Sequence, residues 1–139
     1  MTTEITKRRV ADQDRLIALP NYFGPQYLQY EMAVYDYMTL ASNHSFKGGY
    51  WEYIVLSNGG FFMLWETKRE SIRLSEPGNH FEAEFTIEAA SLVANMAVCS
   101  HLAFLHEQNE FLAQNFDLLR AYAKTLTAPE RKAIFGILD

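Results

Sequence analysis

The sequence predicts an α+β fold, and three observations support this. A β-rich run from Tyr50 to Trp65 contains Asn58-Gly59, a dipeptide typical of tight hairpin turns. Two further short runs alternate strictly between polar and apolar residues, as strands with one buried face do. Apolar residues recur at helical spacing on both sides of these runs. The chain has 139 residues, 49% of them hydrophobic, so we expect a single domain over residues 1–139.

Two helices are expected before the strands, at about residues 4–18 and 25–42. The first has apolar residues at helical spacing among charges, and we expect Pro20 to stop it. The second should begin at Gly24-Pro25, because proline at the first helical position loses no hydrogen bond. Its apolar residues, many of them tyrosines, point in nearly every direction. We therefore expect this helix to be covered on more than one side.

The strands are expected at about residues 50–57, 60–66, 71–75 and 80–86, joined as a four-stranded antiparallel meander. A two-residue turn at Asn58-Gly59 would pair Ser57 with Gly60 and Val55 with Phe62. The first hairpin would then carry apolar side chains on both faces. The last two strands alternate and would have one dry face and one wet face.

Three helices are expected after the strands, at about residues 87–107, 110–125 and 128–138, packed on the meander. Thr86 suits the N-cap of the first, and Thr127 with Glu130 has the spacing of a capping box at the start of the last. No Asp, Glu, Lys or Arg occurs between residues 89 and 105, a length near the lower limit for crossing a bilayer. Because this span contains Ser91 and Asn95, we interpret it as a central buried helix.

The charge balance argues against two nucleic-acid functions. The chain has 12 basic and 17 acidic residues, a net charge of −5. Duplex DNA carries one phosphate per ~1.7 Å, so ~30 Å of it displays ~18 charges. All 17 carboxylates would have to gather on one face to imitate that density. We therefore expect no charge mimicry of DNA, and a pI of 5.3 argues against direct DNA binding.

No residue pattern indicates a catalytic centre, so we expect a protein that is not an enzyme and has no cofactor. Cys99 lies within an apolar helix, where a cysteine packs as a small hydrophobe. His106 is followed by Glu110 where a zinc-protease helix needs a second histidine, so no metal site is expected. An enzymatic alternative would need the polar residues of the last two strands to converge in a deep pocket: Arg73, His80, Glu82 and Glu84.

Two candidate contact sites for a partner follow from the residues. Either one of the N-terminal helices covers the aromatic hairpin, or the hairpin remains open as a partner-binding patch that includes Trp51, Tyr53 and Phe62. Asp139 is the second candidate. Its side chain and the terminal carboxylate place two negative charges after an apolar segment, although such an end is commonly a frayed tail.

Three stretches resemble the ArdB/KlcA family of antirestriction proteins, which are encoded on plasmids and other mobile elements. They are residues 19–25 (LPNYFGP), 48–53 (GGYWEY) and 56–63 (LSNGGFFM), and the likeness extends from about residue 10 to the C-terminus. The resemblance implies protection of incoming plasmid or phage DNA from type I restriction enzymes, without enzymatic activity. It implies contact with the type I restriction-modification complex or with an associated host protein.

The N-terminal residues lack the apolar stretch of a signal peptide, so we expect a cytoplasmic location and no contact with a membrane. Besides the enzymatic alternative described above, a second alternative to the antirestriction function stays open at this point. It is a cytoplasmic protein-binding module with an unrelated partner, which would need only the same aromatic patch.

Overall fold

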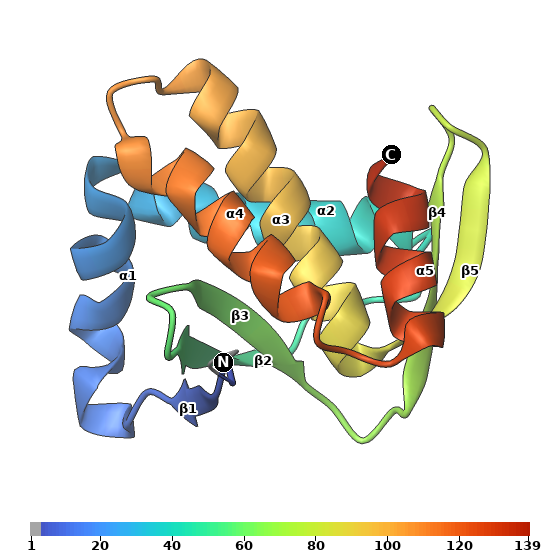
Figure 1. Cartoon of the computed structure of the whole chain (residues 1–139), viewed down its shortest axis with the longest axis horizontal. Helices are drawn as coiled ribbons and strands as arrows, with labels where there is room; N and C mark the ends of the chain where they lie inside the picture. Colours follow the sequence, from blue (N-terminus) through green and yellow to red (C-terminus); the bar gives the residue numbers. More distant parts are fainter. Residues whose placement is uncertain (1–3) are drawn as a thin grey trace.

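The structure is a computed structural model that describes residues 4–139, and it confirms the α+β class (Figure 1). The strands are β1 (Lys7–Arg9), β2 (Tyr50–Leu56), β3 (Phe61–Glu66), β4 (Ser71–Glu76) and β5 (Phe81–Thr86). The helices are α1 (Arg15–Phe23), α2 (Tyr27–Ala41), α3 (Ile87–Leu105), α4 (Glu110–Ala123) and α5 (Ala128–Leu138). Short 3₁₀ turns at Asp12–Asp14 and Gly24–Gln26 precede α1 and α2.

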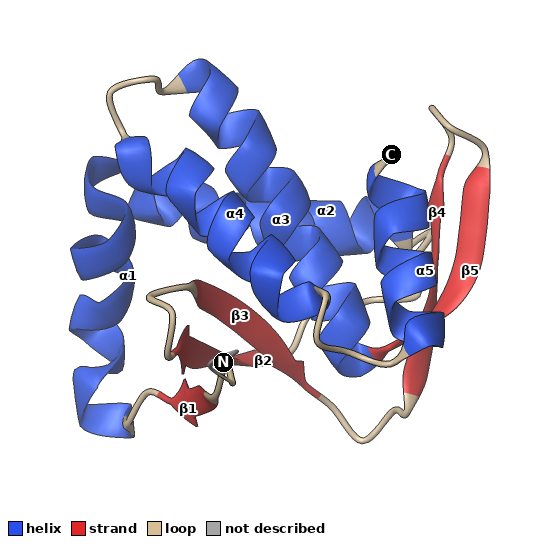
Figure 2. Cartoon of the chain, in the orientation of Figure 1, coloured by secondary structure: helices blue, strands red, loops and turns tan. Residues whose placement is uncertain are grey.

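Helix α3 runs through the centre of the molecule and contacts β3, α2, α4 and α5 (Figures 1 and 2). Helix α4 crosses in front of α3 in this view, and α2 lies behind it. Helix α5 packs between α3 and the β4–β5 hairpin. The predicted central position of the apolar helix is thus confirmed.

The expected first helix at about residues 4–18 is wrong. Residues 7–9 form β1, which pairs antiparallel with β2, Lys7 lying opposite Leu56. Two flanking hydrogen bonds extend the pairing: Ser57 N donates to Thr6 O at 2.8 Å, and Val10 N donates to Tyr53 O at 2.8 Å. The backbone of β2 thus supplies the partners that a helix would have supplied internally, and pairing with an edge outweighs a weak helical pattern.

Proline 20 does not stop a helix, because it lies inside α1. A proline in this position lacks the N–H that would bond to the carbonyl of Leu16, one turn earlier. Leu16 is 92% exposed, so water can reach this part of the helix. The helix instead ends at Gly24, whose φ of 60° is costly for residues with a side chain.

The β2–β3 hairpin is confirmed, but its register differs by one residue from the predicted one. Val55 lies opposite Phe61, and Ile54 lies opposite Phe62. The loop has three residues: Leu56 N donates to Gly60 O at 2.8 Å, and Gly59 has a φ of 96°. This is the three-residue hairpin loop with a left-handed third residue, which differs from the expected two-residue turn.

The four strands after α2 form two sheets and not one meander. Strands β1, β2 and β3 form one sheet, and β4 pairs only with β5 in a second. Side chains from the helices form hydrogen bonds with the edge of β3 that faces away from β2. Asn115 of α4 bonds to both N and O of Phe61 at 2.8 Å, and Asn95 of α3 bonds to both N and O of Met63 at 2.9 Å.

Ser91 of α3 continues this row by accepting a hydrogen bond from Trp65 N at 3.1 Å. Three polar side chains therefore satisfy the backbone groups that a fourth strand would otherwise pair with. This arrangement explains why β4 does not join β3. It also explains why Ser91, Asn95 and Asn115 are fully buried.

By length and composition, helix α3 could span a membrane, but 61% of its most apolar 18-residue stretch is buried inside the protein. This burial is the pattern of a core helix. Its N-cap is confirmed, since the Thr86 side chain accepts a hydrogen bond from Ala89 N. The predicted capping box of Thr127 and Glu130 is likewise present at the start of α5.

Candidate functional site

The aromatic hairpin residues are buried, so the open patch considered from the sequence is not present. Trp51, Tyr53 and Phe62 are 2%, 7% and 0% exposed. Trp51 meets the ring of Tyr35 from α2 edge-on at 5.6 Å. Phe62 lies on the opposite face of the hairpin, stacked at 6.1 Å on Tyr122 of α4. Of the two alternatives, coverage is the one observed, and helices cover both faces.

Arg15 of α1 packs over two tyrosine rings of β2, on the face of the hairpin that carries Trp51 and Tyr53. Its guanidinium lies 4.1 Å from the ring centre of Tyr53 and 4.5 Å from that of Tyr50, a cation–π arrangement. The Tyr53 hydroxyl donates to Glu31 at 3.3 Å, and burial, reinforced by Glu31, raises the pKa of Tyr53 to about 12. Tyr53 therefore stays protonated near neutral pH and is a structural donor.

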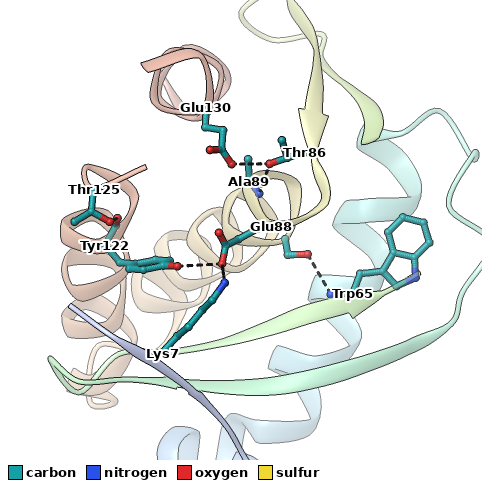
Figure 3. Close-up of polar contacts among 9 residues, drawn as sticks. Lys7, Trp65, Thr86, Glu88, Ala89, Tyr122, Thr125 and Glu130 are labelled. Atoms are coloured by element: carbon teal, nitrogen blue, oxygen red, sulfur yellow. Dashed lines mark hydrogen bonds and ion pairs between the residues drawn. The ribbon is translucent and has the colours of Figure 1, made fainter. Parts of the chain in front are cut away.

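A polar junction joins β1, α3 and α4 at the start of α3 (Figure 3). Lys7 and the hydroxyl of Tyr122 both donate to the Glu88 carboxylate, Tyr122 at 3.0 Å. Burial and the nearby Glu88 raise the pKa of Tyr122. On the adjoining side Thr86 donates to Glu130 at 2.7 Å. Glu88 accepts hydrogen bonds from residues of β1 and α4, and Glu130 accepts one from Thr86 at the end of β5. The junction therefore links α3 to β1 and α4, and it links α5 to β5.

The polar residues that an enzymatic alternative would require are only partly brought together. Arg73 and Glu82 form an ion pair at 2.7 Å between two side chains that are each more than half exposed. Together with Glu84 they line a pocket of about 350 Å³. His80 does not line it and sits at the β4–β5 turn. The four groups therefore do not converge on one position.

Of the side chains considered for nucleophilic or metal chemistry, Cys99 is buried in the core and His106 is hydrogen-bonded to a neighbouring helix. Cys99 is fully buried, and burial raises the pKa of its thiol to about 11, so the reactive thiolate is scarce at neutral pH. His106 Nε2 lies 2.8 Å from Gln29 Oε1. Across residues 4–139, no three His, Cys, Asp or Glu side chains gather as a metal-binding group would require.

The structure places Asp139, the remaining candidate, at a cleft of about 670 Å³. This cleft, which we call the C-terminal cleft, is lined by residues of α3 and α4 and by residues of α5 and the β4–β5 turn. Arg120 of α4 and Lys124, the C-cap residue of this helix, line it, and so do Glu76 of β4 and Asp139. Sequence reasoning missed the two cations, because helix spacing alone does not show which surface lies across from the C-terminus.

Two contacts hold the end of α5 beside this cleft. The side-chain amide of Asn79 donates to the carbonyls of Ile137 and Gly136, at 3.0 and 3.4 Å. At Gly136, an added Cβ would collide with the ring of Phe81. The absence of a side chain at this position therefore allows α5 to approach β5 closely. The last turn is packed and hydrogen-bonded, unlike the frayed tail considered from the sequence.

Tyr37 of α2 also lines the C-terminal cleft. Burial, with a further contribution from the nearby Glu76, raises the pKa of its hydroxyl. The hydroxyl therefore remains protonated and can act as a hydrogen-bond donor. The cleft offers apolar surface, a neutral donor and charges of both signs, which suits binding by complementary contacts.

Comparisons with known proteins agree with the resemblance seen in the sequence. Residues 44–139 match the profile of the antirestriction protein family. The chain is 34% identical to the antirestriction protein KlcA of Escherichia coli, over 97% of this chain and 94% of that protein. It is also 34% identical to the uncharacterized protein YafX of Escherichia coli, over 98% of this chain and 89% of YafX.

The fold is that of a solved relative, with a TM-score of 0.87, 32% sequence identity and complete coverage of both chains. The report of that structure describes a novel fold of the KlcA and ArdB proteins, with antirestriction activity against type I DNA restriction systems in vivo but not in vitro. Sequence and fold agree along nearly the whole length, and the chain belongs to the antirestriction protein family.

Proposed function

We propose that this protein protects unmodified DNA from type I restriction enzymes in the cytoplasm, by contact with another protein and without transforming a substrate. The observation that carries the proposal is the full-length match, at a TM-score of 0.87, to a structure described as having antirestriction activity against type I systems in vivo. The engaged state of Cys99 and His106 and the scattered polar residues of β4–β5 are consistent with a non-enzymatic role.

The charge distribution favours a protein contact over imitation of DNA. Glu88 and Glu82 are engaged with cations, and Glu31 and Glu130 accept hydrogen bonds from hydroxyl groups. These carboxylates lie on different elements, whereas a DNA mimic needs about one negative charge per ~1.7 Å along one surface. The relative's activity in vivo but not in vitro also fits a contact that depends on a cellular component.

A plating assay tests the proposal directly. Unmodified phage is plated on cells that carry a type I system, with and without the protein, and modified phage serves as the control for general effects on infection. We expect the protein to raise the plating efficiency of unmodified phage only. Unchanged plating efficiency at confirmed expression would exclude the proposed function.

A cleavage assay separates the proposed mechanism from charge mimicry. Purified type I enzyme is given unmodified DNA and an excess of the purified protein. A mimic competes with DNA for the same site and should block cleavage, whereas we expect cleavage to continue. Complete inhibition by the purified protein alone would show direct competition and would overturn the proposed route.

A further inference from the structure

The C-terminal cleft has walls of opposite charge. Arg120 lies in the last turn of α4 and Lys124 caps the C-terminal end of this helix, and neither belongs to an ion pair within the described residues 4–139. The lining also includes the acids Glu76, from β4, and Asp139, which follows α5. The cations thus come from the C-terminal end of α4, and the acids come from β4 and from the residue that follows α5, elements that Figure 1 shows on different sides of α3.

Besides these charged residues, the lining of the cleft includes apolar side chains. Met96 and Ala97 of α3 and Phe116 of α4 line it on one side, and Phe135 and Leu138 of α5 line it on the other. Its volume of about 670 Å³ lies within the range that binding pockets usually have, roughly 300 to 1,000 Å³. A ligand that fills it must present apolar surface together with charges of both signs.

We propose that the C-terminal cleft binds an extended peptide segment of a partner protein. In the bound state an acidic side chain of the segment lies against Arg120 and Lys124. An apolar side chain enters the cleft, and a basic side chain lies against Glu76 and Asp139. This inference gives a chemical description of the partner in the proposed function, and it rests on that function only for its biological meaning.

Charge and shape together select this occupant. A nucleic acid would meet the negative wall with phosphates, which like-charge repulsion disfavours. In a symmetric dimer that used this cleft on both copies, two hollows would lie face to face and leave unfilled space that loses dispersion contacts. A peptide segment can insert a side chain and satisfy both walls at once.

The test is an NMR titration of the isotopically labelled protein with capped synthetic pentapeptides. The probe has the order Lys-Leu-Phe-Leu-Asp, and its neutral counterpart has Gln and Asn in place of the charged residues. We expect the charged probe to shift the amide signals of Ala97, Ser100 and Arg120. It should bind about tenfold more tightly than the neutral peptide, the factor expected for two partly exposed ion pairs.

Charge reversal on α4 supplies the matched variants. Arg120→Glu with Lys124→Glu should weaken binding of the charged probe about tenfold. The control variant, Lys68→Glu with Lys132→Glu, changes the net charge equally at two exposed lysines outside the cleft and should bind as the unaltered protein does. Thermal unfolding of both variants checks that each is folded.

Several outcomes would overturn the inference. They are no binding of the charged probe, equal binding of the neutral peptide, signal shifts away from the cleft, and unchanged binding after reversal of the α4 charges. A concentration-dependent dimer in ultracentrifugation that disappears in the α4 variant would assign the cleft to a second copy instead. Because peptide binding is measured on purified protein, its failure is distinguishable from a failure of the plating assay.

Discussion

Asn95 shows how a single buried amide determines the course of the chain. Its side chain bonds to both backbone groups of Met63, donates to Ser91 O at 2.7 Å and accepts from the Tyr30 hydroxyl. All the hydrogen-bonding capacity of the amide is thus used inside the core. The sequence indicated that this residue lies in a buried helix. It could not show the partner, because the bond joins positions 32 residues apart.

Replacing Asn95 with leucine tests this role. Leucine has a similar size but leaves the N–H and C=O of Met63 and the Tyr30 hydroxyl without their partner. Because each buried unpaired group costs roughly 1 to 3 kcal/mol, we expect Asn95→Leu to lower the free energy of unfolding by about 3 kcal/mol or more in urea. The control Asn21→Leu, at an exposed asparagine, should change it by less than about 0.5 kcal/mol. A loss below about 1 kcal/mol for Asn95→Leu would contradict the assignment.

Trp51 gives the corresponding prediction for an apolar residue. With 2% of its surface exposed, Trp51 should contribute to the core, and Trp51→Ala should cost roughly 3 to 5 kcal/mol of stability. The neighbouring Tyr50 is 47% exposed, so Tyr50→Ala should cost much less. Thermal or urea unfolding compares the two variants. If Trp51→Ala keeps the stability of the unaltered protein but abolishes protection of phage, the side chain acts as a contact residue.

The elements that the sequence predicted well are those specified by neighbouring residues. Asn58-Gly59 identified the first hairpin, strict alternation identified β4 and β5, and Thr127 with Glu130 identified the start of α5. These signals act over a few residues. They are therefore readable without knowledge of the tertiary structure.

The elements that were predicted wrongly depend on distant contacts. Strand β1 depends on pairing with β2, in which Arg9 lies opposite Ile54, a residue 45 positions later in the chain. The separation of β3 from β4 depends on Asn95 and Asn115, which lie on α3 and α4. A pattern within one segment contains no information on which edge will receive an outside partner. The aromatic patch was an open question for the same reason.

Glu130 connects the start of α5 to β5, and its contribution should depend on pH. Burial disfavours the charged carboxylate, but hydrogen bonds from Thr86 and Thr127 outweigh this and lower the pKa of Glu130 below its ordinary value of 4.5. A group with a lowered folded-state pKa stabilises the protein above the pKa of the unfolded chain. This stabilisation is lost as the pH falls through the folded-state pKa.

Glu130→Gln should therefore be less stable than the unaltered protein at pH 7, and the difference should shrink below the ordinary pKa of 4.5. Urea unfolding across pH 3 to 7 measures this, with Glu107→Gln, at an exposed acid, as the control. A difference that stays constant across this range would mean that the charge of Glu130 does not contribute. A difference that grows on acidification would contradict the direction of the pKa shift.

The molecule as a whole turns most of its aromatic residues inward, and the C-terminal cleft combines apolar side chains with charges of both signs. The sequence led to the family through motifs such as LPNYFGP, whose Phe23 is fully buried and whose Gly24 has a positive φ. Residues with such roles determine the fold, and they do not show which surface contacts a partner. This is why the family could be predicted, whereas the burial of Trp51, Tyr53 and Phe62 could not. Asp139 lines the C-terminal cleft, and its role as a contact residue stays a prediction.

Removing Leu138 and Asp139 tests whether this end of the chain acts in protection. The anchoring bonds from Asn79 go to the carbonyls of Gly136 and Ile137, so the truncated α5 keeps its attachment to the β4–β5 turn. We therefore expect the melting temperature to fall by no more than about 5 °C, the shift that corresponds to roughly 1 kcal/mol.

Protection of unmodified phage should fall in the same truncated protein, because the cleft loses the negative charge of the Asp139 side chain. Asp117→Asn removes one exposed negative charge from α4 outside the cleft and should leave protection unchanged. Full protection by the folded, truncated protein would exclude the C-terminus from the contact. If the truncated protein fails to fold, its loss of protection says nothing about the charge of Asp139. The variant Asp139→Asn then tests that charge alone, because it keeps the chain length and Leu138. This variant should retain the fold and still lower the plating efficiency, because the wall then has one negative charge fewer.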